Sequence, residues 1–361
     1  MSWPTWLPLR NELRSLSPYG APQVPAAASL NTNENPYPPS LALQGAITDA
    51  VAKVSASLNR YPDRDATQLR SALAIYINEG SGTALSANNI WPANGSNEII
   101  QSIFLAFGSG TAIGFTPSYS MHPLIANVAG TTWISGERNS DFSFNLDLAV
   151  QEIVTHKPTL TFITTPNNPT GDAISIDDIA ALAVAVSAHS GLLIVDEAYA
   201  EFSSEKSALT LIDSHPHVLV IRTMSKAFAF AGARVGYLIG QPLVIDAMML
   251  VRLPYHLSAL TQAAALVALE YRAELLGNVA TLISARQGLI HSLHSLGLST
   301  RPSAANFILF TGFSSPAPQL WSQLLEKGVL IRDVGLSSYL RVTVGNEAEN
   351  KAFIKALTEL L

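Results

Sequence analysis

Short apolar segments alternate with helical patterns through the middle of this 361-residue chain, and this alternation restricts the possible folds more than any other feature. Short apolar runs predict buried strands at residues 111–115, 159–164, 192–195, 218–222 and 235–239. Between the second and third runs, Ser175 and Asp178 have the spacing of a capping box at the start of a helix. Apolar strands separated by helices predict a mostly parallel sheet that helices cover on both faces. The predicted fold class is therefore α/β.

The sequence pattern changes on either side of this region. Eight of the 21 prolines fall within residues 1–40, which disfavours long regular elements and predicts an extended, ordered arm. Beyond residue 257, long helical patterns precede strand-like segments at 306–310 and 339–344 and a final helix, which predict a smaller α+β domain. We expect three parts: an N-terminal arm with part of the small domain (1–45), a large domain (46–256) and a C-terminal small domain (257–361).

Composition argues against several classes of protein. Charged residues make up 13% of the chain, against roughly 25% in typical soluble domains, and acids outnumber bases 27 to 21. A disordered chain and a nucleic-acid partner are therefore not expected. The lack of cysteine excludes disulfides, thiolate nucleophiles and cysteine-ligated metals, and the paired histidines have no carboxylates at ligand-like spacing, so no metal is expected.

Membrane association is not expected either. The most apolar stretches, at residues 179–186 and 263–269, are far shorter than the roughly 20 residues that span a bilayer. Arg10, Glu12 and Arg14 lie near the N-terminus, which lacks the basic and then apolar segments of a secretory signal. We therefore expect a cytoplasmic protein.

Polar motifs follow four of the predicted strands. They are Thr116-Pro117-Ser118-Tyr119, Thr165-Pro166-Asn167-Asn168-Pro169-Thr170-Gly171, Asp196-Glu197-Ala198-Tyr199 and Thr223-Met224-Ser225-Lys226. In a parallel sheet the carboxyl ends of the strands lie at one edge, where ligands bind. We expect these four motifs to meet in one crevice.

Lys226 has the most informative setting in these motifs. It follows a buried strand, lies beside the hydroxyls of Thr223 and Ser225, and precedes Arg234 by eight residues in a stretch with almost no other charge. A lysine in a desolvated, cationic neighbourhood has a lowered pKa and can form a Schiff base with a carbonyl group. Lys226 is therefore the candidate nucleophile.

A cofactor that carries a carbonyl, a phosphate and a pyridine nitrogen would use the remaining polar groups. Asp196 can pair with the protonated pyridine nitrogen, while Tyr199 and Asn168 can bond the phenolic oxygen of the ring. The phosphate can bind the start of the helix that Gly95-Ser96-Asn97 opens, together with Arg234. The cofactor implied is pyridoxal phosphate.

The order and spacing of these motifs resemble the class I and II aminotransferases, which are pyridoxal-phosphate-dependent enzymes of fold type I. The resemblance rests on Asn168-Pro169-Thr170-Gly171, Asp196-Glu197-Ala198-Tyr199 and the segment from Ser225-Lys226 to Arg234, and it runs from end to end. Residues 30–37, 60–63 and 339–345 are similar, more narrowly, to the histidinol-phosphate aminotransferases. The implied fold has a large cofactor-binding domain with a mostly parallel sheet and a smaller α+β domain.

The resemblance implies a role for each matching residue. It makes Lys226 the lysine that holds the cofactor, Asp196 the partner of the ring nitrogen, and Tyr119 the ring that stacks on the cofactor. Tyr199 and Asn168 would bond the phenolic oxygen. The implied phosphate ligands are Ser96, Asn97, Thr223, Ser225 and Arg234, with Tyr61 reaching in from a second subunit. The resemblance therefore implies a homodimer with active sites at the subunit interface.

For the substrates, the resemblance implies that Arg341 binds the anionic end of both, with help from Arg332. In residues 339–344 apolar side chains alternate with polar ones, which places Arg341 off the core face. The further candidates for the wall of the substrate site are Tyr19, Asn35 and Tyr255. The sequence departs from the family at Asn97, where Asp is frequent, and at Ala229-Phe230, where Gly-Leu is common.

The reaction implied is ping-pong transamination: L-histidinol phosphate gives up its amino group, and 2-oxoglutarate accepts it to become glutamate. Lys226 would act as the general acid and base, and imidazole-acetol phosphate would be the other product. Aromatic amino-acid aminotransferase and threonine-phosphate decarboxylase activities stay open as alternatives, because both share the scaffold and nearly all cofactor residues. A non-catalytic binding or regulatory protein of the same fold is a further alternative, which the complete set of Lys226, Asp196 and Arg234 disfavours.

Overall fold

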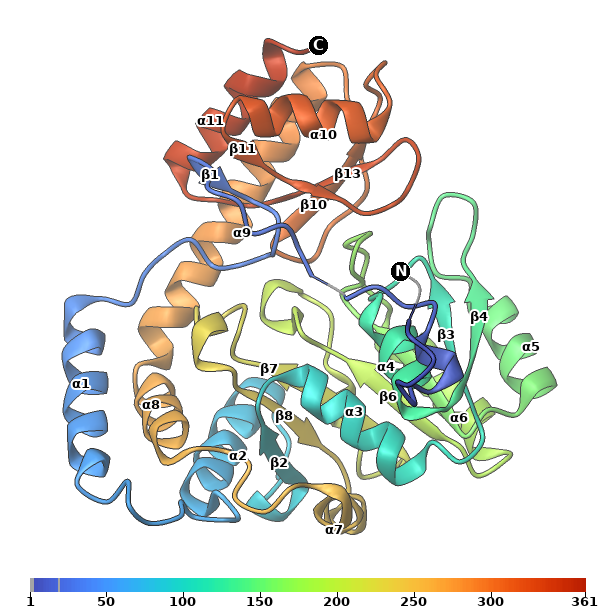
Figure 1. The fold of residues 1–361 in the computed structure, drawn as a ribbon, viewed down its shortest axis with the longest axis vertical. Coiled ribbons are helices and arrows are strands. Elements are labelled where there is room, and N and C mark those ends of the chain that lie inside the picture. Colours follow the sequence, from blue (N-terminus) through green and yellow to red (C-terminus); the bar gives the residue numbers. More distant parts are fainter. Residues whose placement is uncertain (1–2, 19) are drawn as a thin grey trace.

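The computed structural model describes residues 3–18 and 20–361, and a seven-stranded sheet with helices on both faces forms its larger part (Figure 1). In order across the sheet, the strands are β2 (Ile90–Ala93), β8 (Gly236–Ile239), β7 (Val218–Thr223), β6 (Leu192–Asp196), β5 (Leu160–Thr164), β3 (Thr111–Thr116) and β4 (Thr132–Glu137). All neighbouring pairs are parallel except those of β8, which runs antiparallel to β7 and β2. The predicted α/β class with a mostly parallel sheet is confirmed.

The strand side chains alternate between two apolar layers. Ile194 and Ile221 pack on one face of the sheet, whereas Val195 and Val220 pack on the other. The first face is covered by α3 (Ser96–Phe107), α4 (Met121–Ala129) and α7 (Pro242–Val251), and the second by α5 (Leu146–His156) and α6 (Ile176–Ser187). Ser175 begins α6 by accepting a hydrogen bond from the Asp178 amide at 3.1 Å, as its spacing predicts.

A second group of elements lies above the large sheet in Figure 1. Its antiparallel sheet has the order β12 (Arg332–Asp333), β13 (Leu340–Thr343), β10 (Phe307–Thr311) and β9 (Ser299–Thr300). The surrounding helices are α9 (Arg272–Ser295), α10 (Ala317–Glu326) and α11 (Glu347–Thr358). The N-terminal segment joins this group because β1 (Ala28–Ser29) pairs in parallel with β11 (Val329–Leu330).

The helices α1 (Leu41–Ser55), α2 (Thr67–Ser81) and α8 (Ala259–Glu270) pack together beside the large sheet (Figure 1). α8 belongs to the predicted C-terminal part but contacts α2 of the predicted large domain. The three-part division stays a prediction. The remaining short segments are 3₁₀ turns at Asn11–Leu13, Ala87–Asn89, Ala200–Phe202, Ala208–Leu211 and Ala231–Ala233.

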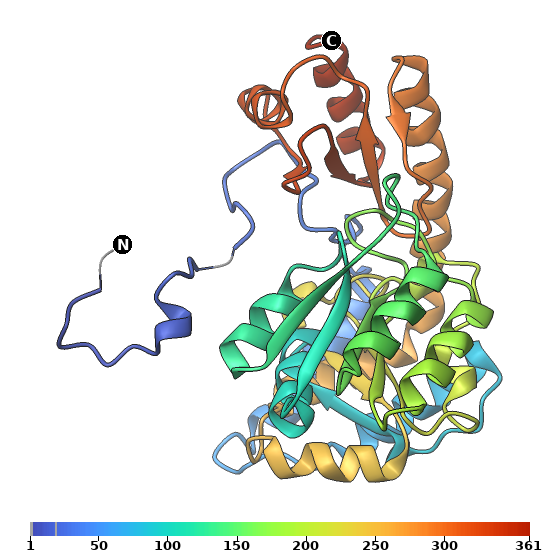
Figure 2. The same ribbon diagram turned by 90° about the vertical axis from the view of Figure 1, so that its right-hand side faces the viewer.

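The beginning of the arm lies on the surface next to α4. A guanidinium nitrogen of Arg10 donates to the carbonyl of Val128, at the end of that helix. Figure 2 shows the arm outside the body formed by the helices and strands. Within the described ranges, the chain has no helix of the length and apolarity that crossing a membrane requires.

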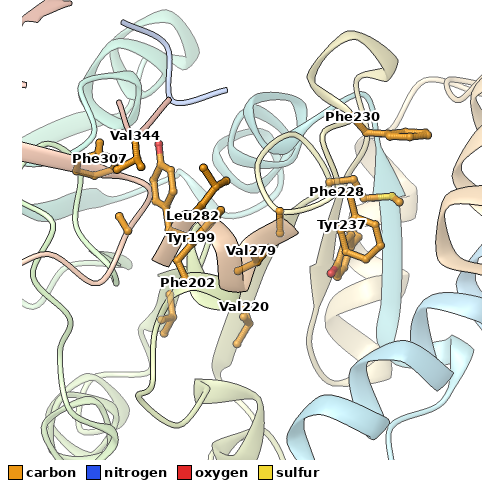
Figure 3. Close-up of a cluster of buried hydrophobic side chains, with 14 of the residues drawn as sticks. Tyr199, Phe202, Val220, Phe228, Phe230, Tyr237, Val279, Leu282, Phe307 and Val344 are labelled. Atoms are coloured by element: carbon orange, nitrogen blue, oxygen red, sulfur yellow. The ribbon is translucent and has the colours of Figure 1, made fainter. Parts of the chain in front are cut away.

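An apolar cluster joins the two groups of elements directly beneath the strand ends. The ring of Tyr199 packs edge-on against Phe307 of β10, with the ring centroids 5.1 Å apart. Figure 3 shows this pair close to Val344, with Leu282 and Val279 of α9 beside Phe202. The motif that follows β6 is therefore packed against the small sheet through Tyr199.

Candidate active site

A cavity of about 390 Å³ lies where β5, β6 and β7 end. Thr164, Asp196 and Thr223 are the last residues of these three strands, and all three line it. The cavity wall includes the predicted residues Ser96, Asn97, Tyr119, Asn168, Asp196, Tyr199, Thr223, Ser225, Lys226, Arg234, Arg332 and Arg341. The structure thus brings together twelve predicted residues from segments spread over residues 96–341.

Lys226 follows β7 and extends into this cavity. Its Nζ donates a hydrogen bond to the carbonyl of Thr32, 2.8 Å away, in the segment that follows β1. Burial, with the positive charges of Arg341 and Arg234, lowers the pKa of Lys226 to about 8, although Glu34 opposes the shift. The setting therefore increases the fraction of neutral, nucleophilic amine near neutral pH.

Asp196 faces the same side of the sheet as Ile194, because successive side chains of β6 alternate. Its Oδ2 lies 3.2 Å from Nε2 of His122, and its Oδ1 accepts a hydrogen bond from the Ala198 amide at 3.2 Å. His122 is buried in the first turn of α4, in contact with the ring of Phe162. Sequence analysis missed His122, although its position in the helix after the Tyr119 motif could have indicated it.

An anion cradle forms at the start of α3. Gly95 has a φ of +86°, which favours glycine, and a Cβ built on it would lie 2.5 Å from Nη2 of Arg234, so a larger residue would displace the guanidinium from this position. A Cβ on Gly236 would likewise lie 2.5 Å from the amide nitrogen of Ser96. Free amides at a helix start, a guanidinium and the Ser225 hydroxyl are the donors that a phosphate requires. The cradle fits the phosphate of the expected cofactor.

The remaining side chains of the cavity are held by hydrogen bonds. Tyr119 donates from its hydroxyl to Oδ1 of Asn97 at 3.1 Å. The Tyr199 hydroxyl accepts a bond from Nδ2 of Asn33 at 2.9 Å. Oδ1 of Asn168 accepts a bond from Nη1 of Arg341 at 2.5 Å. The residues expected around the cofactor ring are therefore linked to the N-terminal segment and to the C-terminal sheet.

Arg341 and Arg332 form the cationic end of the cavity. Arg341 lies directly opposite Arg332 in the antiparallel pairing of β13 with β12, which places both side chains on one face of the small sheet. Nη2 of Arg341 donates to the Asn31 carbonyl at 2.6 Å, and its guanidinium carbon lies 5.1 Å from the centre of the Phe307 ring. Two neighbouring guanidinium groups in a cavity wall can bind a carboxylate or a phosphate.

Three predicted residues, Asn35, Tyr61 and Tyr255, do not line this cavity. Tyr61 is 78% exposed and stacks on Tyr255, with ring centroids 4.4 Å apart, and neither lines the cavity. Asn35 instead bonds the backbone, accepting from the Tyr37 amide at 3.0 Å and donating to the Ala227 carbonyl at 3.4 Å. Tyr19 lies outside the described residues. One chain alone therefore does not bring Asn35, Tyr61 or Tyr255 to the site.

Comparisons with known proteins agree with this geometry. The family model for "Aminotransferase class I and II" matches residues 27–357. A histidinol-phosphate aminotransferase of Mycobacterium sp. (strain JLS) is 53% identical over 358 residues, which cover 98% of this chain and 94% of the relative. One of Corynebacterium glutamicum (strain R) is 51% identical over 358 residues, covering 98% and 97%.

Solved structures show the same fold. The histidinol-phosphate aminotransferase of Sinorhizobium meliloti, solved in complex with pyridoxal-5'-phosphate, matches with a TM-score of 0.84 and 24% identity, covering 98% of this chain and 97% of that one. A double mutant of Thermus thermophilus aspartate aminotransferase matches with a TM-score of 0.83 and 22% identity, covering 98% and 99%.

Proposed function

Because this chain belongs to the class I and II aminotransferase family, we propose that it transfers the amino group of L-histidinol phosphate to 2-oxoglutarate, with pyridoxal phosphate as its cofactor. The products are imidazole-acetol phosphate and glutamate. The observation that carries the proposal is one cavity that contains Lys226, with its pKa of about 8, an anion cradle, and the cationic pair of Arg332 and Arg341. The relatives at 51–53% identity support the choice of amino donor.

When bound, pyridoxal phosphate supplies an electron-accepting ring that stabilises negative charge on the substrate carbon. The residues that we propose to hold its phosphate are Ser96, Asn97, Thr223, Ser225 and Arg234. Asp196 would bind the ring nitrogen, with His122 fixing the direction of its carboxylate. Tyr119 would cover one face of the ring, and Tyr199 and Asn168 would bond its phenolic oxygen.

Lys226 then performs two tasks in our proposal. Its amine would hold the cofactor in the resting enzyme and, when free, would move a proton at the substrate carbon. A pKa of about 8 suits both tasks, because the neutral amine needed for attack and for proton removal is abundant near that pH. The Thr32 carbonyl, 2.8 Å from Nζ, limits where the amine can lie.

Arg341 and Arg332 provide the substrate selection that a two-substrate cycle needs. Guanidinium groups bind carboxylates and phosphates with the same paired donors, so one site can accept the phosphate of the donor and a carboxylate of 2-oxoglutarate. Arg341 is also fixed by the Asn31 carbonyl and stacked over Phe307, so little side-chain freedom remains to be lost on binding.

The test is an amino-donor assay with 2-oxoglutarate as acceptor. Purified enzyme is given L-histidinol phosphate, L-phenylalanine or L-threonine phosphate, and glutamate and carbon dioxide are measured. We expect kcat/KM for L-histidinol phosphate to exceed that for phenylalanine, with no carbon dioxide from threonine phosphate. Faster reaction of phenylalanine, or decarboxylation of threonine phosphate, would replace the proposed function with one of the two alternatives. Protein without a visible cofactor band would favour the non-catalytic alternative.

We further propose a homodimer in which Tyr61 completes the site of the partner subunit. The exposed stacked pair of Tyr61 and Tyr255 and the exposed Leu243, Leu250 and Leu253, in and after α7, offer the apolar surface that such an interface needs. Light scattering should give twice the chain mass. Mixing Tyr61→Ala with Lys226→Ala chains should restore part of the activity, because one hybrid site then has both residues.

A cytoplasmic location also stays a prediction, which fractionation of the native cells tests.

A further inference from the structure

Glu34 is the one acid of the cavity to which the proposed cycle gives no task. Among the described residues that line the cavity, the acids are Glu34 and Asp196, and Asp196 is bound to His122. The Glu34 side chain is exposed, and the structure shows no hydrogen bond or ion pair between its carboxylate and another described residue. Its charge nevertheless acts on Lys226, whose pKa it raises against the effect of burial.

The backbone on both sides of Glu34 is fixed in place. The Asn33 amide donates to the Thr343 hydroxyl at 3.0 Å, and the Asn33 carbonyl accepts a bond from Nδ2 of Asn306 at 3.0 Å. On the other side, the Asn35 side chain accepts a hydrogen bond from the Tyr37 amide at 3.0 Å and donates one to the Ala227 carbonyl at 3.4 Å. An acid held at a cavity wall by a rigid backbone, with its carboxylate free, is arranged to bind a donor that enters the cavity.

The groups of the proposed amino donor can be assigned by elimination. Its amine must lie at Lys226, and its phosphate is matched by Arg341 and Arg332. Its remaining polar group is the imidazole ring, which carries an N–H donor and can take a positive charge. Resting on the proposed function, we infer that Glu34 is a specificity-determining residue that accepts a hydrogen bond from the imidazole N–H of the amino donor.

The same carboxylate has the opposite effect on the second substrate. 2-Oxoglutarate carries two carboxylates, and Arg341 with Arg332 can hold one end while the other stays in the cavity near Glu34. Like charges repel there, so Glu34 favours the ring-bearing donor and disfavours the acceptor. A merely structural role for Glu34 would change both half-reactions in the same direction.

The test uses two unreactive ligands that differ only in the ring: 3-(imidazol-4-yl)propyl phosphate and 3-phenylpropyl phosphate. Dissociation constants are measured by calorimetry on the holoenzyme of the unmodified chain, of Glu34→Gln and of Glu326→Gln. Glu326 is an exposed acid of α10 outside the cavity wall and serves as the control. We expect Glu34→Gln to weaken the imidazole ligand about tenfold, because a neutral amide oxygen replaces a charged acceptor, and to leave the phenyl ligand unchanged.

A second readout is the steady-state KM for each substrate of the ping-pong cycle. Glu34→Gln should raise KM for L-histidinol phosphate, with little change in kcat, and should lower or leave unchanged KM for 2-oxoglutarate. Equal weakening of both ligands, or an undiminished preference for the imidazole ligand in Glu34→Gln, would overturn the inference while the proposed function stands. If the unmodified enzyme does not transaminate L-histidinol phosphate at all, the proposed function and the inference fail together.

Discussion

Asp196 and Glu197 are adjacent acids at the end of β6, yet the two faces of the sheet give them different surroundings. On the first face, Asp196 meets His122 and borders the open cavity with Lys226. On the second face, Glu197 accepts bonds from Arg222 Nε at 2.8 Å, from the Ser207 hydroxyl at 2.7 Å and from the Ala208 amide at 2.7 Å. Asp196 borders a cavity that can hold a ligand, whereas both carboxylate oxygens of Glu197 accept hydrogen bonds from the protein.

The charged side chains of the second face form ion pairs with one another. Arg222 also bonds Glu201 at 3.1 Å, and Glu201 accepts a bond from the Tyr76 hydroxyl at 3.1 Å. Burial alone would lower the pKa of Arg222, but the carboxylates of Glu197 and Glu201 raise it above its usual range. The comparison shows that burial of charge does not mark a functional site. Nor does a cavity alone, because Glu201 and Arg222 line a second cavity of about 830 Å³. What distinguishes the first face is that its cavity contains the amine of Lys226 and the residues at the start of α3 together with an acid.

The largest expected effect is that of Lys226→Ala, which removes the nucleophile from the first face. Transamination should fall to background and the visible band of the lysine-bound cofactor should disappear, because no other described residue of the cavity wall carries an amine that can form a Schiff base. The thermal unfolding midpoint of the cofactor-free chain should not fall, since a desolvated amine is removed. The exposed Lys206→Ala is the control, with activity and spectrum unchanged. A retained visible band would contradict the assignment.

Asp196→Asn should leave cofactor binding largely intact and lower kcat by at least about 100-fold, because the amide cannot stabilise positive charge on the ring nitrogen. Single-turnover kinetics with L-histidinol phosphate measure the effect. The neighbouring substitution Glu197→Gln provides the matched control, and its folded fraction should keep kcat within about threefold. If the two variants lost activity equally, the distinction between the two faces would be wrong.

Arg222→Met tests the second face and should act on stability. Removing one partner of a buried ion pair leaves Glu197 and Glu201 uncompensated, which costs about 3–5 kcal/mol in the free energy of unfolding. Urea denaturation of the cofactor-free chain measures this loss. The cofactor spectrum and the KM for both substrates should be unchanged in the folded fraction, and an altered spectrum at unchanged stability would show that the network belongs to the site.

The pH dependence of cofactor binding tests whether the pKa of Lys226, on the first face, is lowered. Because the pKa of Lys226 is about 8, below its ordinary value of about 10.5, neutral amine accumulates as the pH rises through 8. The rate at which cofactor-free enzyme gains its visible band should therefore rise with a midpoint near pH 8. In Arg341→Met the midpoint should move to higher pH, since one of the charges that lower the pKa is gone. An unchanged midpoint would show that the charge of Arg341 does not lower the pKa of Lys226.

The sequence allowed prediction of those parts of the fold that a local pattern encodes. The strands β5, β6 and β7 are buried on both faces, so each is a continuous apolar run with a polar motif at its end. β2 and β4 were not predicted. They are the edge strands. β2 is buried and apolar, but it has only four residues and contains Pro92, which is unfavourable in a strand. β4 mixes exposed, half-buried and buried side chains, so it has no clear apolar pattern.

The site was predictable where a motif and a strand end coincide, and less so where the fold alone makes the contact. Lys226 and Asp196 lie in such motifs, whereas His122 and the segment with Thr32 and Glu34 reach the cavity only through packing of α4 and pairing of β1. Local sequence does not encode that juxtaposition. The roles of Tyr61 and Tyr255 require a second chain, and they stay predictions of the family resemblance.

The smallest expected effect concerns backbone strain near Lys226, on the first face. Ala229 has a φ of +53°, a left-handed conformation that costs a non-glycine residue about 1 kcal/mol or more, and the family commonly has glycine here. Ala229→Gly should therefore raise the free energy of unfolding by up to about 1 kcal/mol, partly offset by the greater freedom of glycine in the unfolded chain. Ala233→Gly, in the 3₁₀ turn four residues on, should lower it by about 0.5–1 kcal/mol. Opposite signs in urea denaturation would locate the strain at residue 229, and destabilisation by both variants would show that the methyl group of Ala229 contributes more by packing than its conformation costs.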